Sequence, residues 1–422
     1  MALPQYLKNM KKPIISKLSN LCLFLAAGMA ATQAQPYTWD PGLSGGSGGS
    51  GTWNYNSTAN WYNGSGDVKW TDKSANGTNA TVFGNAAGTV TLASSLSASN
   101  LQFTIAGYNL IGAGILTLGA GGIDGSELSS GNTTVGVPLN LPAAQQLWQV
   151  GSGATLGVNG NISRNAGASV DFSATGVTTT SASLTNDAAG IVDGWATSGD
   201  FLGSTTTGDF ISISNSSVVI CTNYLAVSSA SSTSPNLATI TNQNLVSGIL
   251  NGANEITTIT NSVTINSLVQ QGDFSVNNGV TLTLGSGGII MRGESRWLLD
   301  NGGGNYGSAV LTSGLSTGEL FIHTPDNADI AYNSAANNWR IWPRIQDNGS
   351  TPCVLVKDGP GLVSLMNTNS YSGGTIINNG ILVINKNGPL AVNPYTLGTG
   401  VVSINGPGIL ELGYTANLAT LA

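Results

Sequence analysis

Few residues in this chain could carry out catalysis. His323 is the only histidine among the 422 residues, and Asp326 and Asp329 follow it closely. A zinc site with two histidine ligands is therefore excluded, and a Ser-His-Asp triad would have to use this one imidazole. Because His323 stands in the strand-like stretch GELFIHT, we expect its role to be structural.

Carboxylates offer a second kind of chemistry. Glu294, Asp300 and Glu319 could supply the acid and base of a glycosidase, and parallel β-helices do host polysaccharide lyases and hydrolases. However, no Asp-Asp, Asp-His or Arg set marks an active groove around them. The arginines form two groups that we interpret as solvated corners: Arg292 and Arg296 around Glu294, and Arg340 and Arg344 around Trp342. We assign no catalytic residue and predict that the chain is not an enzyme.

Two glycine-rich stretches share letters with ligand-binding loops. Residues 46–51, GSGGSG, have the glycine spacing of a dinucleotide fingerprint, but no strand precedes them and no helix follows. We therefore expect a flexible turn there. Residues 121–125, GGIDG, partly match a calcium-binding repeat corner, but the spacing differs and the stretch occurs once. We assign no metal and no cofactor.

The first 34 residues have the layout of a secretory signal. Four lysines precede a short apolar core at 21–29, and the small residues of AATQA follow it. We predict cleavage after Ala34 and export of the remaining chain. Cys22 lies inside the apolar core and follows Leu21 rather than a small residue, so we do not expect lipidation at this cysteine.

The net charge of the exported chain limits the classes of partner that it can bind. The signal holds only lysines as charged residues, so its removal leaves nine basic residues against 20 acidic ones and a net charge of −11. Such a balance disfavours nucleic acid and anionic lipid, which need cations to neutralise phosphate. We expect no transmembrane segment in the exported chain. With 8% charged and 41% hydrophobic residues, the composition is typical of a folded β-rich extracellular protein rather than a disordered one.

Two cysteines remain after the signal, Cys221 and Cys353. They could pair in an oxidising compartment, but nothing in the sequence brings them together. We expect two buried free thiols.

The segment 357–390 indicates how the chain is built. Apolar and β-branched runs at 362–366, 375–377 and 381–384 are separated by glycine and asparagine turns. These strands are too short and too closely spaced for helical crossovers, and they lack the regular spacing of hairpins. The only plausible short helix after the signal, at 142–149, suits a strand about as well. We predict an all-β fold, a right-handed parallel β-helix of the pectin-lyase-like kind, with a two-sheet sandwich as the alternative.

This segment also resembles a known repeat. The run GPGLVSLMNTNSYSGGTIINNGILVIN is similar to the autotransporter-associated β-strand repeat, or passenger-associated transport repeat. The positions that fit its pattern are Gly359, Gly361, Asn369, Tyr371, Gly373, Gly374, Thr375, Ile377, Gly380 and Leu382. The usual Leu-x-Leu appears as Val363-Ser364-Leu365. The resemblance implies an exported passenger protein and says nothing about chemistry. We expect Gly373-Gly374 to form a corner that needs positive φ or close backbone approach.

Tryptophans and internal similarity suggest the domain layout. Residues 35–83 contain Trp39, Trp53, Trp61 and Trp70 between glycine- and serine-rich turns, and we interpret them as an N-terminal cap over an open coil end. A sugar-stacking platform is the alternative. ILTLGAGGI at 115–123 recurs as TLTLGSGGI at 281–289, so we predict two β-solenoid modules, 84–182 and 183–422, the second containing the repeat at 357–390.

These observations lead to one expected function and two alternatives. We expect an exported, non-catalytic structural or adhesive passenger, secreted or at the cell surface or outer membrane, whose partners are surface glycans or other cell-surface proteins. The alternatives are a polysaccharide-active enzyme and a carbohydrate-binding protein on a β-helix. Apolar residues of the last stretch, including Leu410 and Leu412, fall at an open coil end. We therefore expect either a longer chain with more repeats and an anchor, or an end covered by a partner through end-to-end self-association.

Overall fold

The computed structural model describes residues 36–173, 175–199, 208–227, 240–247, 257–292, 297–300, 307–325, 339–384 and 397–412. Pro36–Ala422 forms one compact unit. Its described residues contain strands, bends and turns, and no helix that could cross a membrane was found among them. Some expectations lie outside the described residues: the signal at 1–34, Glu294, Arg296, Asp326 and Asp329.

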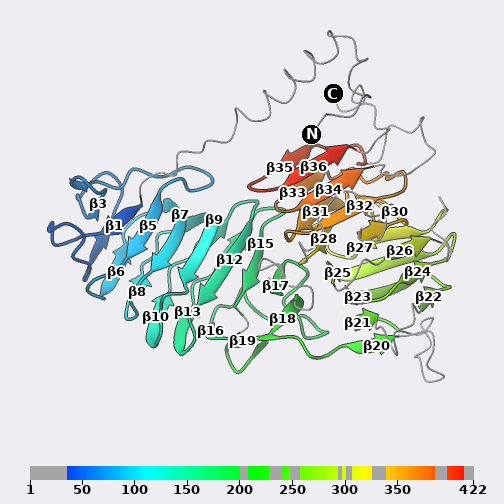
Figure 1. Ribbon diagram of the computed structural model, residues 1–422, viewed down its shortest axis with the longest axis horizontal. Coiled ribbons are helices and arrows are strands. Elements are labelled where there is room, and N and C mark those ends of the chain that lie inside the picture. The colour runs from blue at the N-terminus through cyan, green and yellow to red at the C-terminus, as the bar shows by residue number, and fades with distance from the viewer. Residues whose placement is uncertain are drawn as a thin grey trace, which may run out of the picture. The chain divides into compact units, whose positions relative to one another are not determined.

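The first half of the unit winds into a coil of parallel strands, here called the N-terminal coil (residues 37–220; Figure 1). One face holds β2 (Gly51–Trp53), β6 (Thr89–Leu92), β8 (Asn109–Ile111), β10 (Gly131–Val135), β13 (Ala154–Val158) and β16 (Val177–Thr178). A second face holds β1 (Tyr37–Trp39), β5 (Ala80–Phe83), β7 (Leu96–Phe103), β9 (Leu116–Gly125), β12 (Gln145–Val150), β15 (Ser169–Phe172) and β17 (Ala196–Ser198).

A third face arises because two long strands turn a corner. The pairing of β7 with β9 shifts register between Ala98 and Asn100, and the first part of β9 pairs with β11 (Leu139–Leu141) instead of β12. β14 (Ile162–Arg164) continues this face on β11. Such a bulge re-aims the strand without breaking the coil.

Antiparallel strands lie at both ends of this coil. β3 (Trp61–Tyr62) pairs antiparallel with β1 and with β4 (Asp67–Val68) at the first end. At the other end β18 (Asp209–Ser214) and β19 (Ser217–Ile220) form an antiparallel pair that also bonds to β17 and β16. Such short, differently directed strands cover edges that a parallel coil would otherwise leave open.

The second half forms another parallel coil, here called the C-terminal coil (residues 225–412). Its longest face holds β20 (Leu225–Val227), β21 (Asn244–Ser247), β23 (Val263–Gln270), β25 (Thr281–Met291), β28 (Glu319–His323), β31 (Val354–Asp358), β33 (Thr375–Ile377) and β35 (Val402–Ile404). Another face holds β22 (Thr257–Ile259), β24 (Phe274–Val276), β26 (Trp297–Asp300), β29 (Trp339–Ile341), β32 (Leu362–Leu365), β34 (Ile381–Ile384) and β36 (Ile409–Leu412). The first parts of β23 and β25, with β27 (Val310–Ser313) and β30 (Arg344–Ile345), make the third.

Period-two alternation places the core inside each coil. Leu245, Leu268, Ile289 and Ile322 stand in register on successive rungs, and all four are buried in one apolar cluster. The N-terminal coil has its own cluster, which is distinct from this one. Along these four rungs the inward column therefore stacks aliphatic side chains on one another, as the sequence pattern predicts.

The four N-terminal tryptophans form the start of the first core. Trp39, Trp53, Trp61 and Trp70 are each at most 1% exposed. Their rings pack at centroid distances of 4.7–5.1 Å, mostly edge to face, and contact Phe83 of β5. The interpretation as a cap is confirmed. The alternative of a sugar-stacking platform is wrong for these side chains, because they expose no face to a ligand.

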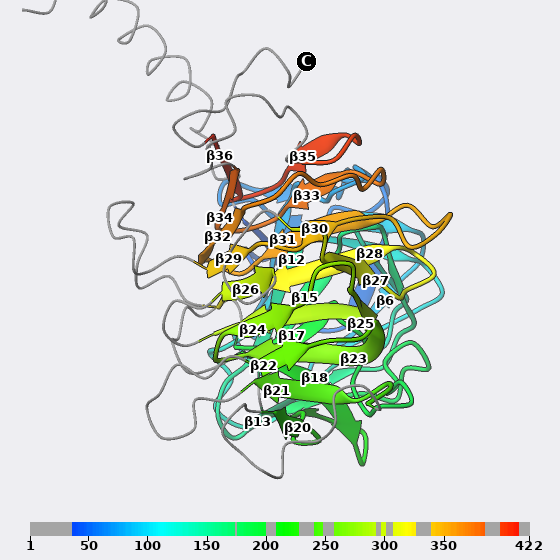
Figure 2. The same ribbon diagram turned by 90° about the vertical axis from the view of Figure 1, so that its right-hand side faces the viewer.

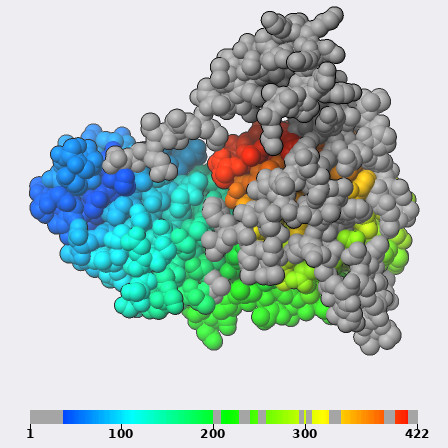
Figure 3. Space-filling view, viewed as in Figure 1, coloured from blue at the N-terminus to red at the C-terminus, as the bar shows by residue number. Residues whose placement is uncertain are grey.

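The two coils pack side by side. Phe321 of β28 and Val356 of β31 belong to the apolar cluster of the N-terminal coil, and Ile376 of β33 packs against it. β28 and β15 are buried at every residue, which means that both their faces are covered. Figure 2 shows the rungs of the C-terminal coil stacked in front of the N-terminal coil, and Figure 3 shows atoms of the two coils in contact.

The predicted fold class is confirmed: the described chain is all-β, and most of its strands stack in parallel as a solenoid rather than as an antiparallel sandwich. Most of the run at 142–149 is strand, β12, rather than helix. The module boundaries at 84–182 and 183–422 stay predictions.

Candidate functional site: a buried polar seam

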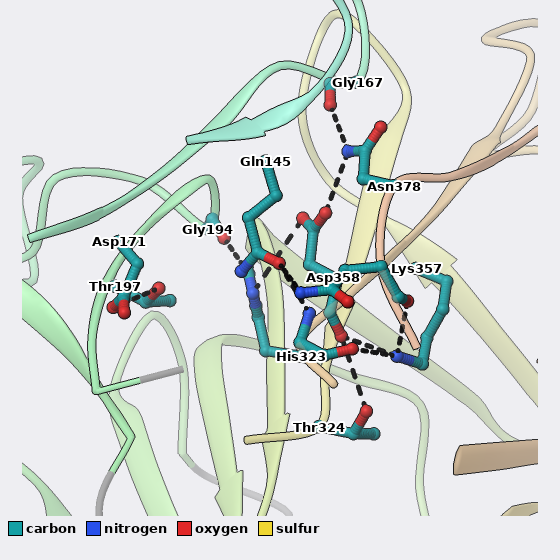
Figure 4. Close-up of polar contacts among 12 residues, drawn as sticks. Gln145, Gly167, Asp171, Gly194, Thr197, His323, Thr324, Lys357, Asp358 and Asn378 are labelled. Carbon is teal, nitrogen blue, oxygen red and sulfur yellow. Dashed lines mark hydrogen bonds and ion pairs between the residues drawn. The ribbon is translucent and has the colours of Figure 1, made fainter. Parts of the chain in front are cut away.

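His323 lies where the two coils meet, and it has no exposed surface. Its Nε2 is 2.7 Å from the carbonyl oxygen of Gly194, in the N-terminal coil, and its Nδ1 is 3.9 Å from Oδ2 of Asp358 (Figure 4). A carbonyl can only accept, so this contact assigns a proton to Nε2. The ring also stacks on Phe321 and meets Phe210 edge-on. The prediction of a structural role fits this setting, because no substrate can reach the ring.

Lys357 is a charged residue inside the solenoid core. It stands in register between Ile322 and Ile377, both of which point inward, and it has no exposed surface. Its ammonium donates to the carbonyl oxygens of Asp358, Gly359 and Asn379 at 2.7, 2.8 and 3.1 Å. These three bonds use all three donors of a lysine, which is what burial of the charge requires. Lys357 thus closes the corner between successive strands.

Sequence reasoning missed this lysine as a core residue, although a signal was present. Leu355 points inward on β31, and period two places Lys357 on the same side of the strand. The same alternation places Asp358 on the outside, where it accepts from Nδ2 of Asn378 at 2.8 Å.

An ion pair joins the coils beside these residues. Nη2 of Arg164 is 3.1 Å from Oε2 of Glu319, and the two side chains are 17% and 2% exposed. Glu319 also accepts the backbone N–H of Gly167 at 2.7 Å. The guanidinium of Arg164 lies over the rings of Trp195 and Phe321. Glu319 therefore links the two coils through a charge-assisted ion pair and a hydrogen bond.

Asp300, Arg292 and Arg340 are further charged candidates that the structure describes, and all three have little exposed surface. Asp300 is buried, and burial raises the pKa of its carboxyl against the opposing effects of backbone hydrogen bonds and Arg344. Arg292 donates to Asp209 and to the carbonyl oxygen of Gly208 at 2.6 and 2.7 Å. Burial lowers the pKa of Arg340, which is 8% exposed. The interpretation of Arg292 and Arg340 as solvated corners is wrong, because both side chains lie within packed parts of the molecule.

The glycine-rich loop at 46–51 is close to a carboxylate of its own chain. Asp40 accepts the backbone N–H groups of residues 44–47, at 2.6–3.2 Å, and the hydroxyl of Ser47 at 2.7 Å. Burial alone would raise the pKa of Asp40, but these hydrogen bonds outweigh it and hold the pKa far below its usual range. Backbone amides in such a turn bind anions, and here the anion is internal.

The calcium-like corner and the cysteines are likewise structural. Asp124, in the stretch GGIDG, accepts from the backbone of Ser126 and from Gln149, each at 3.0 Å. No group of three or more His, Cys, Asp or Glu residues suited to a metal occurs in the described part of the chain. Cys221 and Cys353 are buried free thiols, as expected, and burial raises the pKa of Cys353 to about 12.

The residues of the repeat join successive rungs of the C-terminal coil. The hydroxyl of Tyr371 is 2.6 Å from that of Thr375, and Oδ1 of Asn369 accepts the backbone N–H of Ile345 at 2.8 Å. Gly374 has φ of 98°, and a Cβ on Gly373 would come within 2.5 Å of the carbonyl oxygen of Cys353. The predicted glycine corner is confirmed in both respects.

Fold and seam together define a parallel β-solenoid protein whose buried polar groups serve its own packing. Residues 355–384 match the family model of the passenger-associated transport repeat. The chain is thus a β-solenoid protein that carries this autotransporter-associated repeat. No curated protein and no solved structure matches the chain significantly.

Proposed function

We propose that this chain is an exported, non-catalytic passenger-type solenoid that acts at the cell surface through contact. The observation that carries the proposal is the passenger-associated transport repeat at 355–384, which contributes strands to two successive rungs of a long parallel coil. A passenger of this kind presents a rigid surface to glycans or to proteins of other cells.

The use of polar residues supports a non-catalytic role. A catalytic acid, base or nucleophile must reach its substrate, usually in a cleft. Here His323 and Asp358 have no exposed surface, and Glu319 is 2% exposed and ion-paired across the seam. These charged groups bind other parts of the same chain, at the contact between the coils and at the strand corners.

Export can be tested directly. The full chain and a variant lacking residues 1–34 would be produced in a Gram-negative host, followed by fractionation and mass spectrometry. We expect the full chain to leave the cytoplasm with Gln35 as its new first residue and the shortened chain to stay inside. An uncut chain that stays in the cytoplasm would contradict the proposal.

Contact and catalysis need separate assays. The folded protein is offered to a glycan array and to whole cells, with an acidic protein of similar size as the control. The same preparation is incubated with mixed polysaccharides, and reducing sugar is measured. We expect retention on a surface without sugar release. Release of reducing sugar above the level of the control protein would instead favour the polysaccharide-active enzyme.

A further inference from the structure

We propose that the repeat at 355–384, which contributes strands to two successive rungs, is a two-sided adaptor: its inward residues hold these rungs in the C-terminal coil, and its outward residues form a docking surface for the side of another β-coil. In this chain the docked partner is the N-terminal coil. The inference rests on the seam and is independent of the proposed surface function.

The inward side belongs to the C-terminal coil alone. Leu355, Ile377 and Leu382 are fully buried within the core cluster of that coil. Thr375 stands in register with Leu355 and is held by the hydroxyl of Tyr371. These residues therefore hold the two rungs of the repeat within the C-terminal coil.

The outward side carries an apolar stripe that is shared with the partner. Val356 and Ile376 are in register on adjacent strands, and both pack with the apolar cluster of the N-terminal coil. The fit against Gly167 is close: a Cβ at Gly167 would come within 2.5 Å of Cδ1 of Ile376. A partner must therefore bring a bare backbone to this point.

Amide groups flank the stripe and fix the docked position. Nδ2 of Asn378 donates to the carbonyl oxygen of Gly167 at 2.7 Å. Oε1 of Gln145 accepts both the backbone N–H of Gly359 at 3.0 Å and Nδ2 of Asn379 at 3.1 Å. These hydrogen bonds between buried groups favour one register of the two coils, since another position would lose them. The partner chemistry is thus a glycine corner with a free carbonyl, next to a glutamine.

Amide hydrogen exchange separates the two sides. The N–H of Gly359 donates to Gln145 across the seam, whereas the N–H of Gly373 donates to the carbonyl oxygen of Cys353 within the C-terminal coil. In the full chain we expect Gln145→Leu to speed exchange at Gly359 by about tenfold, the size of one lost hydrogen bond, and to leave Gly373 unchanged. Gln149→Leu, on the same strand but bonded to Asp124, is the matched control and should change neither amide.

Two neighbouring isoleucines give an independent test. Ile376 faces the partner and Ile377 faces the core. We expect Ile376→Ala to speed exchange at Gly359 alone and Ile377→Ala to speed exchange at Gly373. If the Gln145→Leu variant does not fold, Gln145→Asn takes its place. It keeps the amide but shortens its reach, so it should also speed exchange at Gly359 and leave Gly373 unchanged. If both amides respond equally to both isoleucine variants, the inward and outward sides of the repeat form one cooperative unit and the proposal fails.

Discussion

At the level of single residues, aspartates organise loops by accepting several hydrogen bonds at once. Asp40 does so in the N-terminal cap. Asp72 accepts from Ser74, Thr78 and Asn79, and Asp347 accepts from Cys353 and Ser372. For Asp72 and Asp347, burial would raise the pKa, but the hydrogen bonds outweigh it and lower the pKa of each carboxyl. These carboxylates stabilise the fold only while they are ionised.

The first prediction concerns Asp40 and pH. A carboxylate with a lowered folded pKa contributes stability above its unfolded pKa of about 3.9, and this contribution is lost as pH falls through the folded pKa. We expect Asp40→Asn to lower the free energy of unfolding by about 1–3 kcal/mol at pH 7. The difference in free energy of unfolding between the variant and the parent protein should shrink below pH about 4. Denaturant unfolding at several pH values measures it, with exposed Glu127→Gln as the control. A gap that is constant with pH would contradict the argument.

The second prediction concerns the thiols. Burial raises the pKa of both Cys221 and Cys353, so little thiolate exists at neutral pH and reagents have no access. We expect neither cysteine to react with iodoacetamide in the folded protein at pH 8, and both to react in guanidinium chloride. Mass spectrometry reads the added mass. Rapid labelling of the folded chain would show that one of these sites opens.

At the level of the element, glycines decide where one strand ends and the next begins. Gly359, Gly374 and Gly380 of the repeat all have positive φ. At Gly380 an added Cβ would also lie 2.3 Å from the carbonyl oxygen of Gly361 and 2.8 Å from Nζ of Lys357. The corner thus brings the backbone close enough for the lysine to bind three carbonyls. Residues with a side chain would force the strands apart.

The third prediction tests this corner. Gly373→Val and Gly374→Val should each destabilise the protein by about 1–3 kcal/mol, through close contact in the first case and positive φ in the second. Gly66→Val is the matched control, since a Cβ at Gly66 meets no atom within 4 Å. Thermal unfolding compares the three variants. Corner variants that melt with the control would mean that the corner adapts.

The fourth prediction concerns the cap. Trp61 contacts Trp39, Trp53 and Trp70, so its loss leaves a cavity among large rings. We expect Trp61→Ala to cost about 3–5 kcal/mol in the free energy of unfolding. Tyr55→Ala, at a ring that is 41% exposed, should cost far less. Denaturant unfolding followed by tryptophan fluorescence tests both, and equal costs would argue against a packed cap.

At the scale of the whole molecule, the contact between the coils is stabilised by an ion pair that has little exposure to water. Arg164 and Glu319 face each other across 155 residues of sequence, and aromatic rings cover the guanidinium. Removing one partner leaves the other charge largely buried and unpaired. This lowers the free energy of unfolding by more than the pair itself contributes. This asymmetry makes the seam sensitive to single substitutions.

The fifth prediction is a double-mutant cycle across the seam. Arg164→Met and Glu319→Gln should each destabilise by about 3–5 kcal/mol, and the double variant should lose less than the two single losses added together. Because the pair is largely buried, 1 M salt should change little. Lys73→Met, which removes a cation over the exposed ring of Tyr55, is the control and should have a small effect. Strict additivity would mean that the two side chains do not interact in solution.

Local patterns in the sequence determined much of this protein. Short apolar runs between glycine and asparagine turns specify strands and corners, and alternation specifies which residues point inward. The tryptophans of 35–83 and the two cysteines are buried for the same reason: folding removes apolar side chains from water. Gly373 and Gly374 are required by the geometry of a corner between neighbouring rungs of one coil, so the sequence predicts their role as well.

Only the tertiary structure decided how the two coils meet and what the polar residues do there. The hydrogen bonds from His323 to Gly194, from Gly167 to Glu319 and from Asn379 to Gln145 join residues 129, 152 and 234 positions apart. Hydrophobic periodicity and turn preferences relate only residues that are close in sequence. The path of the chain between the coils decides which of their faces come into contact. Asp40 and the loop at 46–51 show the same limit at short range. The letters GSGGSG indicate a bendable backbone, and only folding shows that its amides surround a carboxylate already in the chain.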